Sequence, residues 1–144
     1  MFSRGASRDW ATKGPLLLGV RAVLAVSFDP AHRANLVRTG ILPVQIDRTT
    51  YEILSGREKL DIVLPEGLED AAAAGRRPSD DRVTLGLGDG GFDLEADMRL
   101  DNSYEVELFA KGGVIKDLLR KSLGNQKSVK KAEETAEKTK VGAS

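Results

Sequence analysis

Four residues near the start of the chain have the types that bind an anion. Gly5 and Ala6 are followed by the hydroxyl of Ser7 and the guanidinium of Arg8, and a helix is predicted from Asp9 onward. Backbone N–H groups in the first turn of a helix have no partner within the helix and carry a partial positive charge. The planar guanidinium offers two parallel N–H donors to a carboxylate. Taken alone, the stretch equally fits a polar turn with a solvated Arg.

The residues that follow must position this stretch. Residues 9–18 suit a helix that ends at Gly19, with Trp10 packed in the core. Residues 21–28 form a short, almost continuous apolar run rich in β-branched side chains. Such a run is typical of a central strand that is buried on both faces.

A second helix and strand come next. Asp29 suits the N-cap and Pro30 the first turn of a helix that Gly40 closes. Residues 41–46 then return as a strand, which Pro43 places at an edge or a bend. A strand, a helix and a strand in so short a stretch predict a βαβ crossover and an α/β fold class.

The pattern of residues in the remainder of the chain predicts further strands and helices, with one long loop among them. Residues 59–64 alternate polar with apolar side chains, and residues 83–87 and 92–100 flank a glycine-rich turn as in a hairpin. Residues 65–81 have the composition of a loop. The final elements are a helix that starts at Asn102 or Ser103 and an amphipathic helix over residues 114–123, with Gly112 and Gly113 between them.

Composition limits the classes of function. The 22 basic residues balance 22 acidic ones, so no global positive field favours nucleic acid or a membrane surface. Cysteine is absent and His32 is the single histidine, so thiolate or His-cluster metal sites are excluded. We interpret His32 as a hydrogen-bonded helix residue and not a base. No apolar run approaches the roughly 20 residues that a membrane-spanning helix needs. We expect a cytoplasmic location, with a mitochondrial location as the alternative.

Residues 1–123 are expected to form one domain and residues 124–144 a charged, flexible tail.

Several motifs in this domain, in order and at consistent spacing, resemble the C-terminal swivel domain of aconitases, particularly the aconitase A branch. The same domain is the small subunit of isopropylmalate dehydratase. The segments that carry the resemblance are Gly5-Ala6-Ser7-Arg8-Asp9-Trp10-Ala11-Thr12-Lys13-Gly14, Gly19-Val20-Arg21-Ala22-Val23-Leu24-Ala25, Ser27-Phe28, His32-Arg33-Ala34-Asn35-Leu36-Val37, Gly40-Ile41-Leu42-Pro43, Ser103-Tyr104-Glu105-Val106-Glu107-Leu108-Phe109 and Gly112-Gly113-Val114-Ile115-Lys116-Asp117-Leu118-Leu119-Arg120.

The resemblance implies a swivelling β/β/α domain and a hydro-lyase that acts on hydroxy-acids such as citrate and isocitrate. It implies a 4Fe-4S cluster on a separate, cluster-bearing domain or subunit, since this chain has no Cys. In the family motif Gly-Ser-Ser-Arg, the second Ser and the Arg bind substrate carboxylate, and Ser7 and Arg8 match them. Ala6 stands at the position of the first Ser, the catalytic base, and a methyl group cannot accept a proton.

In the family, the first half of the domain precedes this motif. The resemblance therefore implies that the N-terminal half is missing here, and that the strand over residues 21–28 borders an exposed sheet edge. Two alternatives to a hydro-lyase component stay open. One is a catalytically inactive remnant that binds a carboxylate or a partner protein. The other is RNA binding through Arg8, Arg33 and Arg38, against which the zero net charge argues.

Overall fold

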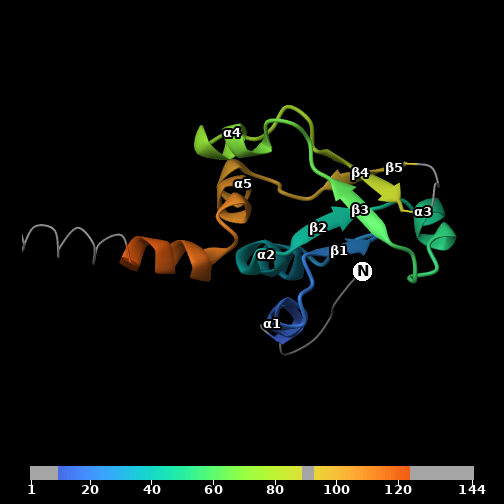
Figure 1. Ribbon diagram of the computed structural model, residues 1–144, viewed down its shortest axis with the longest axis horizontal. Coiled ribbons are helices and arrows are strands. Elements are labelled where there is room, and N and C mark those ends of the chain that lie inside the picture. Colours follow the sequence, from blue (N-terminus) through green and yellow to red (C-terminus); the bar gives the residue numbers. More distant parts are fainter. Residues whose placement is uncertain (1–9, 89–92, 124–144) are drawn as a thin grey trace, which may run out of the picture. The chain divides into compact units, whose positions relative to one another are not determined.

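A computed structural model of the protein describes residues 10–88 and 93–123 (Figure 1). Its contacts divide the chain into two units, residues 1–114 and 115–144, which are described separately. Among the described residues, the first unit holds a five-stranded sheet and the helices α1 to α5. The predicted boundary after residue 123 stays a prediction.

The predicted βαβ crossover is present. Strand β1 (Ala22–Ala25) pairs in parallel with β2 (Leu42–Gln45), and α2 (Pro30–Thr39) connects them. The carboxylate of Asp29 accepts hydrogen bonds from two backbone N–H groups of the first turn of α2, each at 3.1 Å. Gly40 ends the helix with a φ of 82°, a conformation that glycine adopts without strain. Both predicted ends of this helix are confirmed.

The sheet has the order β1-β2-β5-β4-β3. Strands β4 and β5 form the predicted hairpin, although residues 89–92 of its turn lie outside the described residues. Strand β5 also pairs antiparallel with β2, and β3 pairs antiparallel with β4. The sheet is therefore mixed, with bounds β3 (Leu60–Val63), β4 (Arg82–Leu87) and β5 (Leu94–Met98).

Strand β1 corrects one prediction. We expected residues 21–28 to form a central strand buried on both faces, but only Ala22–Ala25 are extended and β1 is an edge strand of the described sheet. Its first three residues are half-buried and only Ala25 is fully buried. An apolar run does not by itself distinguish a central strand from an edge strand.

Pro43 corrects a second prediction, because β2 is an interior strand between β1 and β5. Leu42 and Ile46 donate their N–H groups toward β1, so the nitrogen of Pro43 faces the opposite side. There β5 has already ended at Met98, and the carbonyl of Pro43 accepts from the N–H of Arg99 at 2.9 Å. Pro43 therefore lies just beyond the paired residues of β2 and β5, so its missing N–H removes no hydrogen bond of a paired residue.

Three shorter helices complete the first unit. Helix α3 spans Arg48–Ile53, and the predicted cap at Asn102 opens α5 (Ser103–Ala110). The expectation that residues 65–81 form only a loop is wrong, because they contain α4 (Leu68–Ala73). Leu68, Ala71 and Ala72 of α4 are buried, and α4 packs against α5. Tertiary packing thus stabilises a helix too short to form alone.

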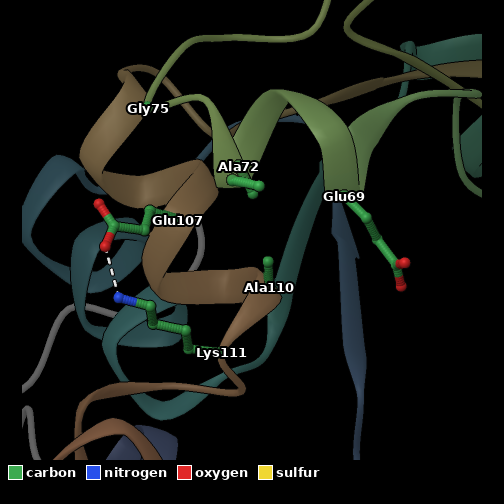
Figure 2. Close-up of a pocket in the computed structure, with 7 residues that line it drawn as sticks. Glu69, Ala72, Gly75, Glu107, Ala110 and Lys111 are labelled. Atoms are coloured by element: carbon green, nitrogen blue, oxygen red, sulfur yellow. Dashed lines mark hydrogen bonds and ion pairs between the residues drawn. The ribbon is translucent and has the colours of Figure 1, made fainter.

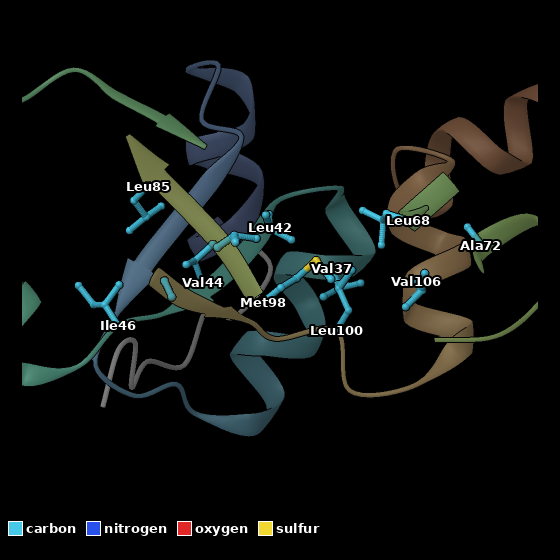
Figure 3. Packing of buried hydrophobic residues seen from close by; sticks show 12 residues of the cluster. Val37, Leu42, Val44, Ile46, Leu68, Ala72, Leu85, Met98, Leu100 and Val106 are labelled. Atoms are coloured by element: carbon cyan, nitrogen blue, oxygen red, sulfur yellow. The ribbon is translucent and has the colours of Figure 1, made fainter. Parts of the chain in front are cut away.

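The core lies between the sheet and α2, and it continues into the contact of α4 with α5. Val37 from α2 meets Met98 and Leu100 beside β5, and Val106 of α5 lies near Ala72 of α4 (Figure 3). Burial of each larger aliphatic side chain contributes about 1.5–3 kcal/mol to the stability of the folded state. The cluster comprises Val37, Leu42, Val44, Ile46, Leu68, Ala72, Val83, Leu85, Ala96, Met98, Leu100 and Val106.

The C-terminal ends of α2 and α5 meet backbone to backbone. A Cβ at Gly40 would lie 2.6 Å from the carbonyl oxygen of Gly112, and a Cβ at Gly113 would lie 2.7 Å from that of Arg38. Both Gly40 and Gly113 also have positive φ angles. Glycine is therefore required twice at this contact, for conformation and for space.

The predicted helix after this contact is present over residues 114–123. Within it, the Lys121 Nζ lies 2.8 Å from an oxygen of Asp117. The apolar residues on which its amphipathic character was predicted are more than half exposed: Ile115, Leu118, Leu119 and Leu123. The predicted tail over residues 124–144 lies outside the described residues.

Candidate functional site

The predicted carboxylate site lies just before the first described residue. Ala6, Ser7 and Arg8 are outside the described residues, so their proposed roles stay predictions. The helix predicted to follow them is confirmed as α1 (Trp10–Leu17), which packs against α2. Gly19, with a φ of 87°, lies just after its end.

The orientation of α1 corrects the interpretation of Trp10 as a core residue. Its side chain is 68% exposed, whereas Thr12 is the buried residue of this helix. At about 100° per residue, Thr12 points away from the side that carries Trp10. The half-buried Leu16 lies one turn after Thr12, on the same side of the helix.

The N-terminus of α2 resembles an anion site but is occupied by the protein itself. Asp29 accepts from the backbone N–H groups of Ala31 and His32, which are the donors that an anion would otherwise use. His32 lies in this first turn, as predicted, and is buried. Burial lowers the pKa of His32, and the negative charge of Asp29 only partly opposes this effect. The neutral form is thus favoured.

A network of ionised side chains joins α2 to the start of α5. Nη1 and Nη2 of Arg33 donate to the two carboxylate oxygens of Glu105 at 2.7 and 2.9 Å. Nη1 also donates to the carbonyl of Arg99 at 3.0 Å, and Nε lies 3.2 Å from an oxygen of Asp101. Arg99 in turn donates to Gln45 of β2. The network connects α2, β2 and the segment between β5 and α5.

The electrostatics of this network favour the ionised forms of Arg33 and Asp101. The hydrogen bonds to Glu105 raise the pKa of Arg33 against the opposing effect of burial, and the charges of Glu105 and Asp101 act in the same direction. Burial by itself would raise the pKa of Asp101. The hydrogen bond from Arg99 and the charges of Arg33 and Arg99 together outweigh it, so the pKa of Asp101 is lowered.

The network also corrects the role considered for Arg33 in RNA binding. Its donors are committed to a carboxylate and a backbone carbonyl, and its side chain is only 11% exposed. It cannot reach a phosphate without breaking a buried ion pair. Arg38 is exposed in the last turn of α2.

A cavity of about 450 Å³ opens between α4 and α5 (Figure 2). Small residues line it, including Ala72 and Ala110, together with the carboxylates Glu69 and Glu107. Glu107 pairs with Lys111. The described residues that line the cavity include none of those predicted to bind substrate. Sequence reasoning missed it because α4 was assigned to a loop, although the Ala71–Ala74 run was a helix signal.

Comparison with known proteins decides the family. A family model described as "Aconitase C-terminal domain" matches residues 1–49. Aconitate hydratase A of Legionella pneumophila is 38% identical over 124 residues, 83% of this chain. The proteins of the same name from Deinococcus radiodurans and Corynebacterium jeikeium are each 36% identical, over 91% and 87% of this chain. The chain belongs to the aconitase C-terminal domain family.

The mixed α/β fold agrees with an aconitase swivel domain. The chain spans 13–14% of the length of the aconitate hydratase A relatives that it matches. Most of each relative therefore lies outside the matched segment.

The residues of this aconitase domain do not fit an iron–sulfur cluster. The 144-residue sequence has no Cys, so it provides no thiolate ligand. Among the described residues, no group of three or more His, Cys, Asp or Glu side chains is arranged to hold a metal ion. Nor does any helix in that part of the chain have the length and apolar character to cross a membrane.

Proposed function

We propose that this chain is the swivel-domain part of an aconitase-type hydro-lyase, which dehydrates and rehydrates a hydroxy di- or tricarboxylic acid such as citrate or isocitrate. The observation that carries the proposal is the 36–38% identity to three proteins named aconitate hydratase A, over 83–91% of the chain. The proposed partner is a domain or subunit that bears the 4Fe-4S cluster. A cytoplasmic location, with citrate and isocitrate as substrates of the tricarboxylic acid cycle, forms part of the proposal.

The chain's own role is to bind the substrate carboxylate. The hydroxyl of Ser7 donates one hydrogen bond, and the guanidinium of Arg8 donates two parallel ones. Arg8 is two positions before Trp10, the first residue of α1, and the partial positive charge at a helix N-terminus favours an anion near it.

A second candidate function is a catalytically inactive remnant that binds a carboxylate or a partner protein. Ala6 favours it, because the methyl group removes the base that the family motif carries at that position. RNA binding is a weaker alternative. With Arg33 paired, only Arg8 and Arg38 remain of its three candidate phosphate contacts, and the net charge is zero.

Calorimetric titration of the full chain with citrate, and separately with isopropylmalate, tests the binding role. We expect Arg8→Gln to weaken citrate binding about 10- to 100-fold, the value of hydrogen bonds to a charged group. Arg38→Gln removes an exposed guanidinium from α2 and is the matched control, for which we expect no change. Absence of citrate binding to a folded sample, or equal binding by both variants, contradicts the assignment.

Activity distinguishes the hydro-lyase component from the remnant. The full chain is mixed with a cluster-bearing aconitase part, and conversion of citrate to isocitrate is followed. We expect Ala6→Ser to raise the rate about 10²–10⁴-fold, the usual contribution of a general base. If the chain with Ala6 is already fully active, the proposed loss of the base is wrong. If Ala6→Ser is inactive while citrate still binds, the remnant is favoured.

A further inference from the structure

The helix over residues 114–123 exposes its large apolar side chains. Four of them, each 56–60% exposed, form what we call the C-terminal apolar face: Ile115, Leu118, Leu119 and Leu123. At about 100° per residue, they lie within an arc of about 140° on one side of the helix. Single exposed apolar residues are common on protein surfaces, but a group on one side of a helix marks a site of interaction.

Basic residues border this face on both sides. Lys116 precedes Leu123 by two helical turns and so lies beside it at one border. Lys121 follows Leu118 by three residues and lies at the other border. Asp117 is the single acidic residue between positions 114 and 123, and it lies on the side of the helix opposite the apolar face. The surroundings of the face are therefore positively charged.

The zero net charge of the whole chain conceals an uneven distribution. Residues 1–114 contain 14 basic and 18 acidic side chains, whereas residues 115–144, the second unit, contain eight basic and four acidic ones. The positive excess is concentrated at the beginning of this unit, since residues 115–131 contain five Lys, one Arg and one acidic residue. A group of roughly four to eight basic residues on or beside an amphipathic helix is typical of a segment that binds anionic lipid headgroups.

The combination of aliphatic and basic side chains distinguishes between possible partners. Nucleic acid would attract the lysines, but its phosphate backbone offers nothing to cover four aliphatic side chains. A second copy of the helix, packed face to face, would bring lysines against lysines at the borders. Protein interfaces are enriched in aromatic residues and Arg and depleted in Lys. Here the face is entirely aliphatic, and Lys outnumbers Arg five to one over residues 115–131.

We propose that the C-terminal apolar face binds the surface of a membrane that contains anionic lipids. The ten residues of the helix measure about 15 Å, half of the roughly 30 Å hydrocarbon core, so the helix lies along the surface and does not cross it. The aliphatic side chains enter the boundary between headgroups and acyl chains, and the lysines at its borders extend to the phosphates. This binding is additional to the proposed hydro-lyase function and does not rest on it.

Cosedimentation of the full chain with lipid vesicles tests the inference. Vesicles of phosphatidylglycerol and phosphatidylcholine in equal parts are compared with vesicles of phosphatidylcholine alone, which have no net charge. We expect binding to the anionic vesicles to be about tenfold tighter or more. It should weaken when the salt is raised from about 0.1 M to about 1 M, because the screening length falls from about 10 Å to about 3 Å.

Two pairs of variants locate the contact. Leu119→Gln removes apolar area but keeps helix propensity, and it should weaken binding to the anionic vesicles about tenfold. Its control is Leu17→Gln, which changes an 80% exposed leucine of α1 and should have no effect. Lys116→Gln should weaken binding about fivefold, whereas Lys59→Gln, at an exposed position of the first unit, should leave it unchanged. Circular dichroism of each free chain confirms that its fold is kept.

Four results overturn the inference. Equal binding to the two kinds of vesicle, or none to either, removes the role of anionic lipids. Binding that Leu119→Gln leaves unchanged means that charge alone holds the chain and that the apolar face takes no part. An RNA oligonucleotide bound as tightly as the anionic vesicles would assign the basic residues to nucleic acid. Self-association in analytical ultracentrifugation that Leu119→Gln abolishes would assign the face to a second copy.

Discussion

Arg33 connects α2 to the start of α5, and we predict that its loss destabilises the domain far more than the loss of a surface ion pair. The side chains of Arg33 and Glu105 are each 11% exposed, and their two hydrogen bonds measure 2.7 and 2.9 Å. The Arg33→Met substitution keeps the apolar stem but removes the charge. Glu105 is then left buried without its counter-ion.

The magnitude follows from the surroundings of Glu105. Breaking a buried ion pair from one side costs about 3–5 kcal/mol. The backbone N–H of Asp101 continues to donate to Glu105 at 2.8 Å, which keeps the cost near the lower limit. We therefore expect the free energy of unfolding to fall by about 3 kcal/mol, and the melting temperature to fall by roughly 10 °C.

Urea denaturation followed by circular dichroism measures this change. Arg48→Met is the matched control, because Arg48 pairs with Glu52 at 3.2 Å with side chains that are 79% and 65% exposed. Its cost should stay within about 0.5 kcal/mol. The double variant Arg33→Met, Glu105→Gln should recover about 1–2 kcal/mol relative to Arg33→Met, because no buried charge remains unpaired.

Two results would refute this reasoning. One is an Arg33→Met variant within 1 kcal/mol of Arg48→Met, roughly the range of exposed pairs. The other is a double variant no more stable than Arg33→Met alone. Either would mean that water reaches Glu105 after the substitution and solvates it, so that burial in the folded state does not determine the cost.

Two further predictions concern Gly113 and Glu58. Gly113→Ala should lower the free energy of unfolding by more than about 2 kcal/mol in urea denaturation, because the new Cβ would lie 2.7 Å from the carbonyl oxygen of Arg38. Gly56 is the control: it has a similar φ of 80° but open space around it, so Gly56→Ala should lower the free energy of unfolding by only about 1–2 kcal/mol. Equal costs of the two substitutions would contradict the steric argument. Hydrogen bonds from the side chain and the backbone N–H of Ser55 lower the pKa of Glu58 from 4.5 to about 2, so the stabilisation by its ionised form is present above pH 4.5 and is lost as the pH falls toward 2. Ser55→Ala should raise this pKa toward 4.5 in a ¹³C NMR titration of the carboxyl group, and an unchanged midpoint would show that the side-chain hydrogen bond has no effect.

The elements that could be predicted are those with local signals. Asp29 and Gly40 mark both ends of α2 because capping depends on residues within one turn. Asn102 marks the start of α5 for the same reason, and its side chain accepts from the N–H of Glu105 at 2.9 Å. The alternating residues of β4 and β5, together with the glycine-rich segment between them, predicted the hairpin.

The predictions that were wrong depended on contacts between distant residues. Whether β1 is central or at an edge depends on which strands pair with it, and the apolar run carries no such information. Pro43 is tolerated in an interior strand only because β5 ends opposite it. Six residues of α4 are too few for a reliable pattern, and the helix is stabilised by α5.

The candidate site was predictable only through the family resemblance. Nothing in the spacing around Ser7 and Arg8 distinguishes a carboxylate site from a polar turn. The partner of Arg33 lies 72 residues away in sequence, so its ion pair with Glu105 was not predictable from the chain alone. Trp10 was assigned to the core by its residue type, whereas the phase of α1 relative to α2 decides its exposure.

The order of strands has a consequence for how the sheet forms. Strands β1 and β2 with α2 make one local half, and β3 with β4 and β5 makes another, joined through two registered pairs of β2 with β5. The hydrogen bond of Gln45 with Arg99 beside this joint links residues 54 apart. The loop-closure entropy of that span must be overcome before the pairing gains any energy. We therefore expect the joining of β5 to β2 to be slow relative to formation of each half, and in that interval each half would have an unpaired edge that another chain could bind.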